Sequence, residues 1–291
     1  MTWLIIIALL VFAVLLYFFI WYKSSGIRER ISASPILMMH SVKDNLDAGI
    51  STVTKKQFAA FIDQAKKKGF SFGAIDERLA GLRPHDTGGA AVYLSFDDGY
   101  ADFYRLFREY LEPNSIPAAV FMTVGYIGKP ASWDYKLAPA LHLSIEQLQN
   151  LSRSELLTIG SHSLSHADLT RIGQDRIEKE VAESKKILED IIGRQVKYFS
   201  YPFGRFSERV IEAVKRAGYR AAFCGVPHRF KGPDNLFMIP RIPLNLLDNL
   251  FTFTQKIKPG PLSWMEFSRA RVIEQFSCLT YRVRGSQWSN F

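Results

Sequence analysis

Short apolar runs alternate with amphipathic stretches along most of the chain, and this alternation predicts its fold. The runs are bounded by charges or turn residues, which is typical of buried strands. They lie at residues 35–39, 91–94, 118–124, 156–159, 198–201, 220–224 and 238–244. Because helical patterns separate several of these runs, we expect an α/β protein with mostly parallel strands.

Helices are indicated between the strands by apolar residues at helical spacing and by signals at their ends. Thr54 and Gln57 form the pattern of a capping box, and Gly69 follows as a stop signal. A long amphipathic helix is expected at residues 175–192, before Gly193. Shorter helices are expected at residues 103–111, 145–151 and 207–217.

Residues 3–22 form an uncharged apolar stretch that, as a helix, is long enough to cross the hydrocarbon core of a bilayer. Trp3 and Trp21 lie near its ends, where aromatic side chains favour the membrane interface. No cleavage site is evident after it, so we expect a retained transmembrane anchor rather than a signal peptide. Lys23 and two arginines follow, and the positive-inside tendency would then place the remaining chain in the cytoplasm.

Size and charge narrow the class of protein only slightly. A chain of 291 residues, 47% of them hydrophobic, suits one large domain with appendages. The net charge of +9 fits either an ordinary solvated surface or attraction to anionic lipids or an acidic glycan. No motif for nucleic-acid binding accompanies this charge. The two cysteines, Cys224 and Cys278, are far apart and form no disulfide framework.

Two clusters of hard metal ligands follow predicted strands. Asp97 and Asp98 stand in the segment SFDDG, whereas His162 and His166 stand in the segment HSLSH. Side chains that leave the ends of different parallel strands can meet at the mouth of an α/β barrel. Two imidazoles and one carboxylate would bind a divalent cation and leave positions open for water and substrate. Each cluster alone also suits a turn or a polar surface, and their combination indicates metal-assisted hydrolysis.

A third segment, YPFG at residues 201–204, follows another predicted strand. In this order, SFDDG, HSLSH and YPFG resemble the motifs of the polysaccharide deacetylases, also called the NodB-homology domain or carbohydrate esterase family 4. The resemblance covers roughly residues 35–244 and implies a distorted (β/α) barrel of about seven strands. We therefore expect an anchor, a linker, a catalytic domain and a basic C-terminal extension at residues 1–22, 23–34, 35–250 and 251–291.

The resemblance implies a role for each matching residue. Asp97 would be the catalytic base, taking a proton from the water that attacks the acetamide carbonyl. Tyr201 and Phe203 would lie at the substrate, with a backbone N–H near Phe203 meeting the charge on the carbonyl oxygen. Zinc is the expected metal, and cobalt, nickel and iron suit the same ligands. These ligands would be Asp98, His162 and His166.

Two positions depart from the family pattern. Ser200 stands where many members have an arginine that pairs with the base; Arg241 is the candidate replacement, with a plain surface arginine as the alternative. The late Leu-x-His that supplies a general acid has no histidine here, since the nearest segment is Pro-Leu-Asn at residues 243–245. In the circularly permuted branch that deacetylates exopolysaccharides, this acid is an early histidine. His40 matches it, with a histidine of no chemical role as the alternative.

These residues predict a metal-dependent hydrolase that removes N-acetyl groups from amino sugars of a polysaccharide or glycolipid. Trp133 is expected to line the sugar groove, with packing as its alternative use. Two other functions stay open: an O-acetyl esterase with the same site, and a non-catalytic membrane-tethered glycan-binding protein. The resemblance to enzymes of exopolysaccharide and peptidoglycan favours the outer face of the cell membrane, against the charge rule.

Overall fold

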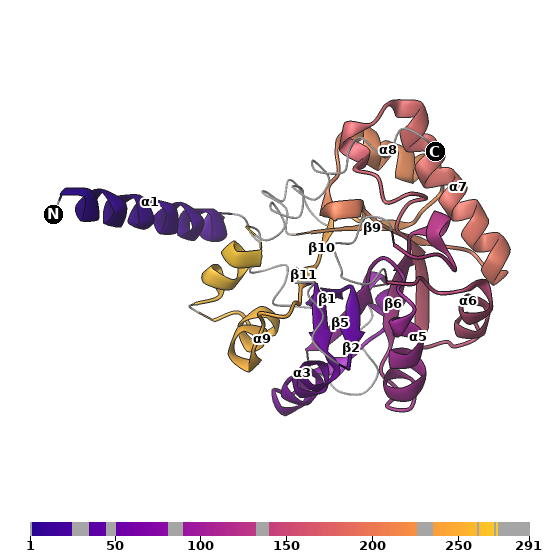
Figure 1. Cartoon of the computed structure of the whole chain (residues 1–291), viewed down its shortest axis with the longest axis horizontal. Helices are drawn as coiled ribbons and strands as arrows, with labels where there is room; N and C mark the ends of the chain where they lie inside the picture. Colours follow the sequence, from indigo (N-terminus) through magenta and orange to yellow (C-terminus); the bar gives the residue numbers. More distant parts are fainter. Residues whose placement is uncertain are drawn as a thin grey trace.

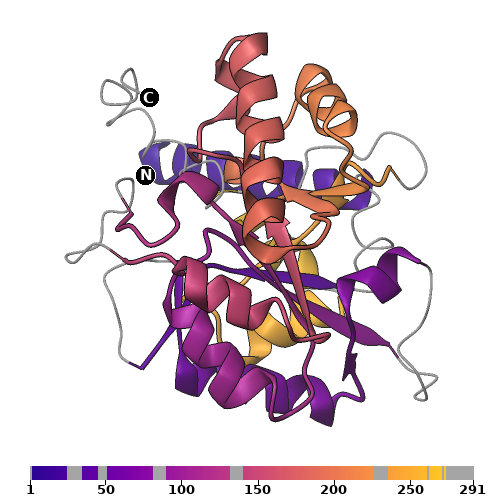
Figure 2. The same ribbon diagram turned by 90° about the vertical axis from the view of Figure 1, so that its right-hand side faces the viewer.

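The computed structural model describes residues 2–24, 35–44, 51–80, 90–131, 140–225, 235–260, 262–270 and 272. Within these ranges, parallel strands form a nearly closed barrel, and helices cover its outside (Figures 1 and 2). The α/β class and the barrel expected from the sequence are therefore confirmed.

Eight strands follow one another around the barrel, and each is parallel to its neighbours. In spatial order they are β10 (Ile239–Pro240), β9 (Ala221–Cys224), β8 (Tyr198–Ser200), β7 (Leu157–Ser161), β6 (Ala118–Met122), β5 (Ala91–Phe96), β1 (Ile36–Met39) and β11 (Ile242–Pro243). A further strand, β4 (Ser71–Phe72), pairs with β5 outside this path.

Arg241 lies where the barrel closes. The strands on either side of it in sequence form the two ends of the path, since β10 pairs with β9 and β11 pairs with β1. A single extended segment therefore leaves one edge of the sheet and joins the other. The sequence predicts one strand at residues 238–244, and the structure divides it because the segment changes its pairing partner at Arg241.

Side chains along each strand alternate between the barrel interior and its outer surface, as the pleat requires. Tyr93, Phe121 and Phe223 belong to one buried cluster inside the barrel. Neighbouring residues such as Leu94 belong to the larger core between strands and helices. Gly160 follows the inward set, and an added Cβ there would come within 2.5 Å of the Phe121 ring. This alternation decides which residues at the strand ends face the interior.

The helices form largely where the sequence predicts them. Thr54 and Gln57 make the capping box that begins the helix Lys55–Lys67, and Gly193 ends the helix Gln174–Ile192 with a φ of 67°. The helices of the barrel domain are α3 (Lys55–Lys67), α4 (Ile75–Leu79), α5 (Asp102–Leu106), α6 (Ile145–Leu151), α7 (Gln174–Ile192), α8 (Glu208–Arg216) and α9 (Leu250–Ile257). Shorter turns are π-helical at Phe107–Leu111 and 3-10 at Val124–Tyr126, Leu169–Arg171 and Pro202–Gly204.

Some small elements escape sequence analysis. A separate parallel pair, β2 (Ser41–Lys43) and β3 (Thr52–Thr54), lies where the sequence analysis predicts no strand. β4 and α4 are also absent from the sequence expectations. These elements have five residues or fewer, too few for a hydrophobic period to repeat.

A helix is present at the apolar N-terminus, as α1 (Thr2–Ser24), but its assignment as a transmembrane anchor is not confirmed. Among the residues whose placement the structure describes, no helix combines the length and apolar character needed to cross a membrane. The last turns of α1 instead pack on the rest of the protein. Tyr22 is buried and stacks on Phe267, with ring centroids 5.6 Å apart, and Phe19 meets Trp264 edge-on.

The expected C-terminal extension at residues 251–291 is, in its described part, an integral part of the fold. Residues 263–270 are helical and follow α9. Phe253 in α9 is buried and stacks on Phe61 of α3, with ring centroids 4.7 Å apart. These apolar contacts tie α9 to the helices of the barrel. Residues 25–34 of the expected linker and the segment from residue 273 onward lie outside the described residues.

Candidate active site

Inward-facing residues at the carboxyl ends of β5, β7 and β8 form a polar cluster. Ser95 and Asp97 continue the inward set of β5, which includes Ala91 and Tyr93. His162 follows β7 in phase with Gly160, and Ser200 ends β8 in phase with Tyr198. All of these polar residues are buried. The alternation of side chains along each strand therefore directs these residues into the same end of the barrel.

Asp98 reaches the same place through a turn rather than through strand parity. Its φ is +70°, and that of the following Gly99 is +76°, so two successive residues occupy the left-handed region. A glycine adopts this conformation without strain, whereas an aspartate pays a modest cost. The turn makes the adjacent carboxylates of Asp97 and Asp98 diverge, so they can serve different roles.

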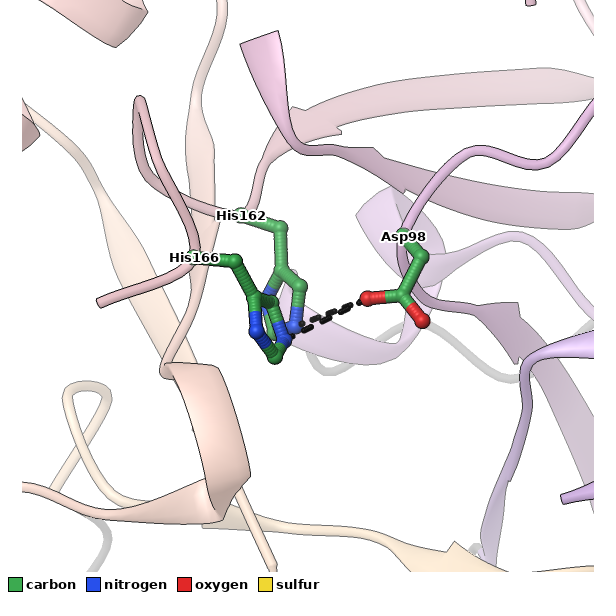
Figure 3. A group of neighbouring side chains, drawn as sticks. All are labelled: Asp98, His162 and His166. Carbon is green, nitrogen blue, oxygen red and sulfur yellow. Dashed lines mark ion pairs between the residues drawn. The ribbon is translucent and has the colours of Figure 1, made fainter. Parts of the chain in front are cut away.

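Asp98, His162 and His166 present three donor atoms that lie within 4.8 Å of one another (Figure 3). Asp98 Oδ1 is 3.7 Å from His162 Nε2 and 3.4 Å from His166 Nε2. The same Asp98 oxygen is buried and accepts no hydrogen bond from the described residues. A buried carboxylate oxygen without a donor is costly, and a cation would satisfy it. The donor set therefore fits a divalent metal ion.

A hydrogen bond fixes the tautomer of His162. Its Nδ1 lies 2.8 Å from the Ser200 carbonyl oxygen, which can only accept, so Nδ1 carries the proton. Nε2, which faces Asp98, therefore keeps its lone pair for a metal. Burial also lowers the pKa of His162 to about 4, against the opposing charge of Asp97, so the ring is neutral at ordinary pH.

Asp97 is held by Arg241 in a bidentate pair. Arg241 Nη1 donates to Oδ1 at 2.7 Å, and Nη2 donates to Oδ2 at 2.6 Å. Arg241 Nη2 also donates to the Ser200 hydroxyl at 2.7 Å, and this hydroxyl lies 3.3 Å from Asp97 Oδ2. The guanidinium carbon of Arg241 lies 5.3 Å and 5.9 Å from the ring centroids of Phe121 and Phe223. Arg241, the candidate replacement for the arginine of the family pattern, thus contacts Asp97 from the segment that closes the barrel.

The pKa of the Asp97 carboxyl reflects two opposing effects. Burial raises it, but the positive charge of Arg241, with smaller effects from His162 and His40, holds the pKa well below its usual range. Asp97 is therefore ionised at neutral pH and can accept a proton. His162 Nε2 lies 3.9 Å from Asp97 Oδ2, which places this carboxylate beside the three metal donors.

His40 joins the site from the bend between β1 and β2. It is half-buried, and it lies close enough to Asp97 to influence the pKa of that carboxyl. The backbone carbonyl of the preceding Met39 accepts a 2.8 Å hydrogen bond from Asp97 N, which ties the two strand ends together. The structure thus places His40 near Asp97.

Tyr201, Phe203 and Trp133 are the other residues that the sequence analysis expects at the substrate. Tyr201 is fully buried in the outer core, and its hydroxyl donates to the Phe237 carbonyl at 3.1 Å, so we no longer assign it a substrate contact. Strand parity explains this: Ser200 faces inward, and the next residue faces outward. Phe203 has a φ of 58°, and its ring centroid lies 4.7 Å from that of His166. Trp133 lies outside the described residues.

Two residues at this site were not recognised from the sequence. Ser95 accepts a 3.3 Å hydrogen bond from Arg241 and donates to the Leu37 carbonyl at 2.8 Å, so it helps to orient the arginine. The sequence could have indicated this role, because Ser95 lies two residues before Asp97 and therefore faces the same side of the strand. Glu180 contacts the loop between the two histidines, and its signal was a charged residue on the apolar face of α7.

Comparisons with known proteins agree with this geometry. Residues 85–222 match the family model for polysaccharide deacetylases. YxkH of Bacillus subtilis, named as a polysaccharide deacetylase, is 26% identical over 223 residues, which are 76% of this chain and 74% of YxkH. The poly-β-1,6-N-acetyl-D-glucosamine N-deacetylase of Staphylococcus aureus is 24% identical over 66% of this chain and 67% of that enzyme.

A solved structure supports the same assignment. BC0361, a polysaccharide deacetylase from Bacillus cereus, superposes with a TM-score of 0.62 and is 25% identical, covering 77% of this chain and 69% of BC0361. The family match spans β5 to the start of β9, including both ligand clusters. Residues 85–222 therefore belong to a polysaccharide deacetylase domain, and the chain is a carbohydrate deacetylase.

Proposed function

We propose that the protein hydrolyses N-acetyl groups on amino sugars of a polysaccharide or glycolipid in a metal-dependent reaction. One observation carries the proposal: the ionised, unligated carboxylate of Asp97 lies beside three convergent metal donors. A base that works next to a metal must keep its lone pairs available, and the turn at Asp98 separates the two carboxylates accordingly.

The metal would be held by Asp98, His162 and His166. When bound, a divalent ion supplies Lewis acidity, which polarises the acetamide carbonyl and lowers the pKa of a water molecule. The residues of the chain do the rest. His162 is held in the tautomer that presents Nε2, because its Nδ1 proton is donated to Ser200. Zinc is the expected ion, and cobalt, nickel or iron fit the same donors.

Asp97 and His40 would share the proton transfers. Asp97 accepts a proton from the attacking water, and the bidentate contact with Arg241 keeps its carboxylate ionised and oriented. An amine is a poor leaving group unless it is protonated, so the sugar nitrogen needs an acid. His40, on the Asp97 side of the site, would donate that proton. Backbone N–H groups in the turn around Phe203, beside His166, would meet the developing charge on oxygen.

Two observations support the proposed substrate class: the substrate of a relative and the presence of His40 as a candidate general acid. The Staphylococcus aureus relative is an N-deacetylase of poly-β-1,6-N-acetyl-D-glucosamine, so an N-acetylated glycan is the first substrate to test. The missing late histidine favours an O-acetyl esterase only if no other acid is present. Because His40 lies near Asp97, we favour amide hydrolysis over ester hydrolysis. The outer face of the cell membrane stays our expected location, and a reporter fused after Phe291 tests which side carries the domain.

Acetate release from N-acetylglucosamine oligomers and from acetylated xylan tests the proposal. We expect turnover of the oligomers and weak or no turnover of the xylan. A chelator should abolish the activity, and added zinc, cobalt or nickel should restore it. Activity that survives complete chelation would refute the metal-dependent reaction, and xylan as the better substrate would refute the preference for amides.

A further inference from the structure

The loop that joins the two histidine ligands is backbone-strained. Ser163 has a φ of 71° and His166 has a φ of 61°, so two non-glycine residues within HSLSH occupy the left-handed region. In this conformation the Cβ of a non-glycine residue crowds the backbone, so each of the two residues is strained relative to a relaxed backbone. A loop of this kind holds its shape only when surrounding contacts outweigh the strain.

Hydrogen bonds within the loop fix its two ends. The Ser163 hydroxyl accepts a 3.0 Å hydrogen bond from His166 N. The Ser161 hydroxyl accepts a 3.3 Å hydrogen bond from Ser163 N and donates to Ser184 of α7 at 2.8 Å. In the middle of the loop, the Leu164 carbonyl accepts a 2.8 Å hydrogen bond from Gly125 N. The N–H groups of Leu164 and Ser165 are bound by another group.

Glu180 of α7 holds that middle. Its Oε2 accepts hydrogen bonds from Leu164 N at 3.0 Å and Ser165 N at 2.8 Å, and its Oε1 accepts one from the Ser165 hydroxyl. The residue is only 4% exposed, although it lies on the apolar face of α7 between Ile177 and Ser184. Burying a carboxylate is costly unless charge-assisted hydrogen bonds offset the loss of water. Within the described residues, all of the hydrogen bonds that Glu180 accepts come from the loop between His162 and His166.

We propose that Glu180 is a positioning residue that preorganises the metal site by clamping the strained loop between His162 and His166. The inference rests on the proposed metal-dependent function. Without the clamp, the left-handed residues can relax, and the imidazole of His166 leaves the position that faces Asp98. A partner of this kind commonly contributes 10–100-fold to metal affinity.

The experiment measures the zinc dissociation constant of folded protein by competition with a chromophoric chelator. Three variants are compared with the wild type: Glu180→Ala, Glu180→Gln and Glu183→Ala. Glu183 is an exposed glutamate on the same helix and serves as the matched control. In Glu180→Gln the amide oxygen can accept both backbone N–H groups, and the amide nitrogen can donate to the rotatable Ser165 hydroxyl. Circular dichroism checks that each variant is folded at the temperature of the measurement.

We expect Glu180→Ala to weaken zinc binding by at least about tenfold, consistent with the loss of a supporting contact around a metal. Glu180→Gln should stay within about threefold of wild type, and the control should be unchanged. A role in stability alone would lower the unfolding midpoint of the metal-free protein without changing the zinc affinity of the folded form. Unchanged affinity in folded Glu180→Ala would therefore overturn the inference.

A second variant keeps the test decisive if Glu180→Ala does not fold. Glu180→Asp retains the charge but withdraws the carboxylate from the loop by one methylene, and we expect it to weaken zinc binding as well. Unchanged affinity in this variant would also overturn the clamp. A wild-type protein that binds no zinc, cobalt or nickel would instead refute the proposed metal site itself, and with it the clamp.

Discussion

Arg241 donates one hydrogen bond to each carboxylate oxygen of Asp97, although the two residues are 144 positions apart in sequence. The contact exists because Arg241 lies between β10 and β11, where one segment bridges the two edges of the barrel. Closure of the sheet and orientation of the proposed base therefore depend on the same short segment.

Replacing Arg241 with glutamine should move the acid limb of the pH profile for kcat/KM to higher pH. Burial raises the pKa of Asp97, and Arg241 is the main opposing charge, so its removal lets the pKa rise. Activity that requires ionised Asp97 is then lost at a higher pH than in wild type. Arg241→Lys keeps the charge and should shift the limb less. An unshifted limb in folded Arg241→Gln would contradict this account of the base.

His40→Gln should separate amide from ester substrates. An amide leaving group needs a proton, whereas an ester with a good leaving group needs little help from an acid. We expect kcat on an N-acetylated oligosaccharide to fall by about 10²–10⁴-fold, the usual contribution of a general acid. Hydrolysis of an activated acetyl ester should change by less than about tenfold. An equal loss on both substrates would argue against His40 as the acid.

The described C-terminal residues should contribute directly to stability. Phe253→Ala removes a buried ring that stacks on Phe61, which typically costs about 3–5 kcal/mol in the free energy of unfolding. Phe251 lies on the same helix but is 57% exposed, so Phe251→Ala should change that free energy by about 0.5 kcal/mol or less. Urea unfolding of both variants tests the difference, and similar midpoints would contradict the integral role of α9.

Much of the fold was predictable because its periodic segments are long enough to show a pattern. α7 repeats its apolar face over five turns, and α6 begins and ends at the predicted residues. The strand at residues 238–244 was predicted as one unit, since its apolar pattern does not record a change of pairing partner. The β2–β3 pair was not predicted, because strands of three residues are too short for a hydrophobic period to repeat.

The site was predictable where short motifs carry the chemistry. Asp98, His162 and His166 converge as the motif spacing suggested, and Arg241 reaches Asp97 from a distant segment. Tyr201 was expected at the substrate but is buried in the outer core. It follows the inward-facing Ser200, so its side chain points to the opposite side, and the YPFG motif does not record this direction. Glu180 was missed because hydrogen bonds to backbone N–H groups leave no motif in the sequence.

Asp97→Asn, measured for both turnover and metal content, tests the central claim most directly. We expect one zinc ion per chain, bound with near wild-type affinity, since Asp98, His162 and His166 are intact. Turnover of N-acetylglucosamine oligomers should fall below detection because the amide cannot accept the proton from water. Asp98→Ala, as the matched variant, should lose both zinc and activity. Wild-type turnover in folded Asp97→Asn would contradict the assignment of the base and the mechanism built on it.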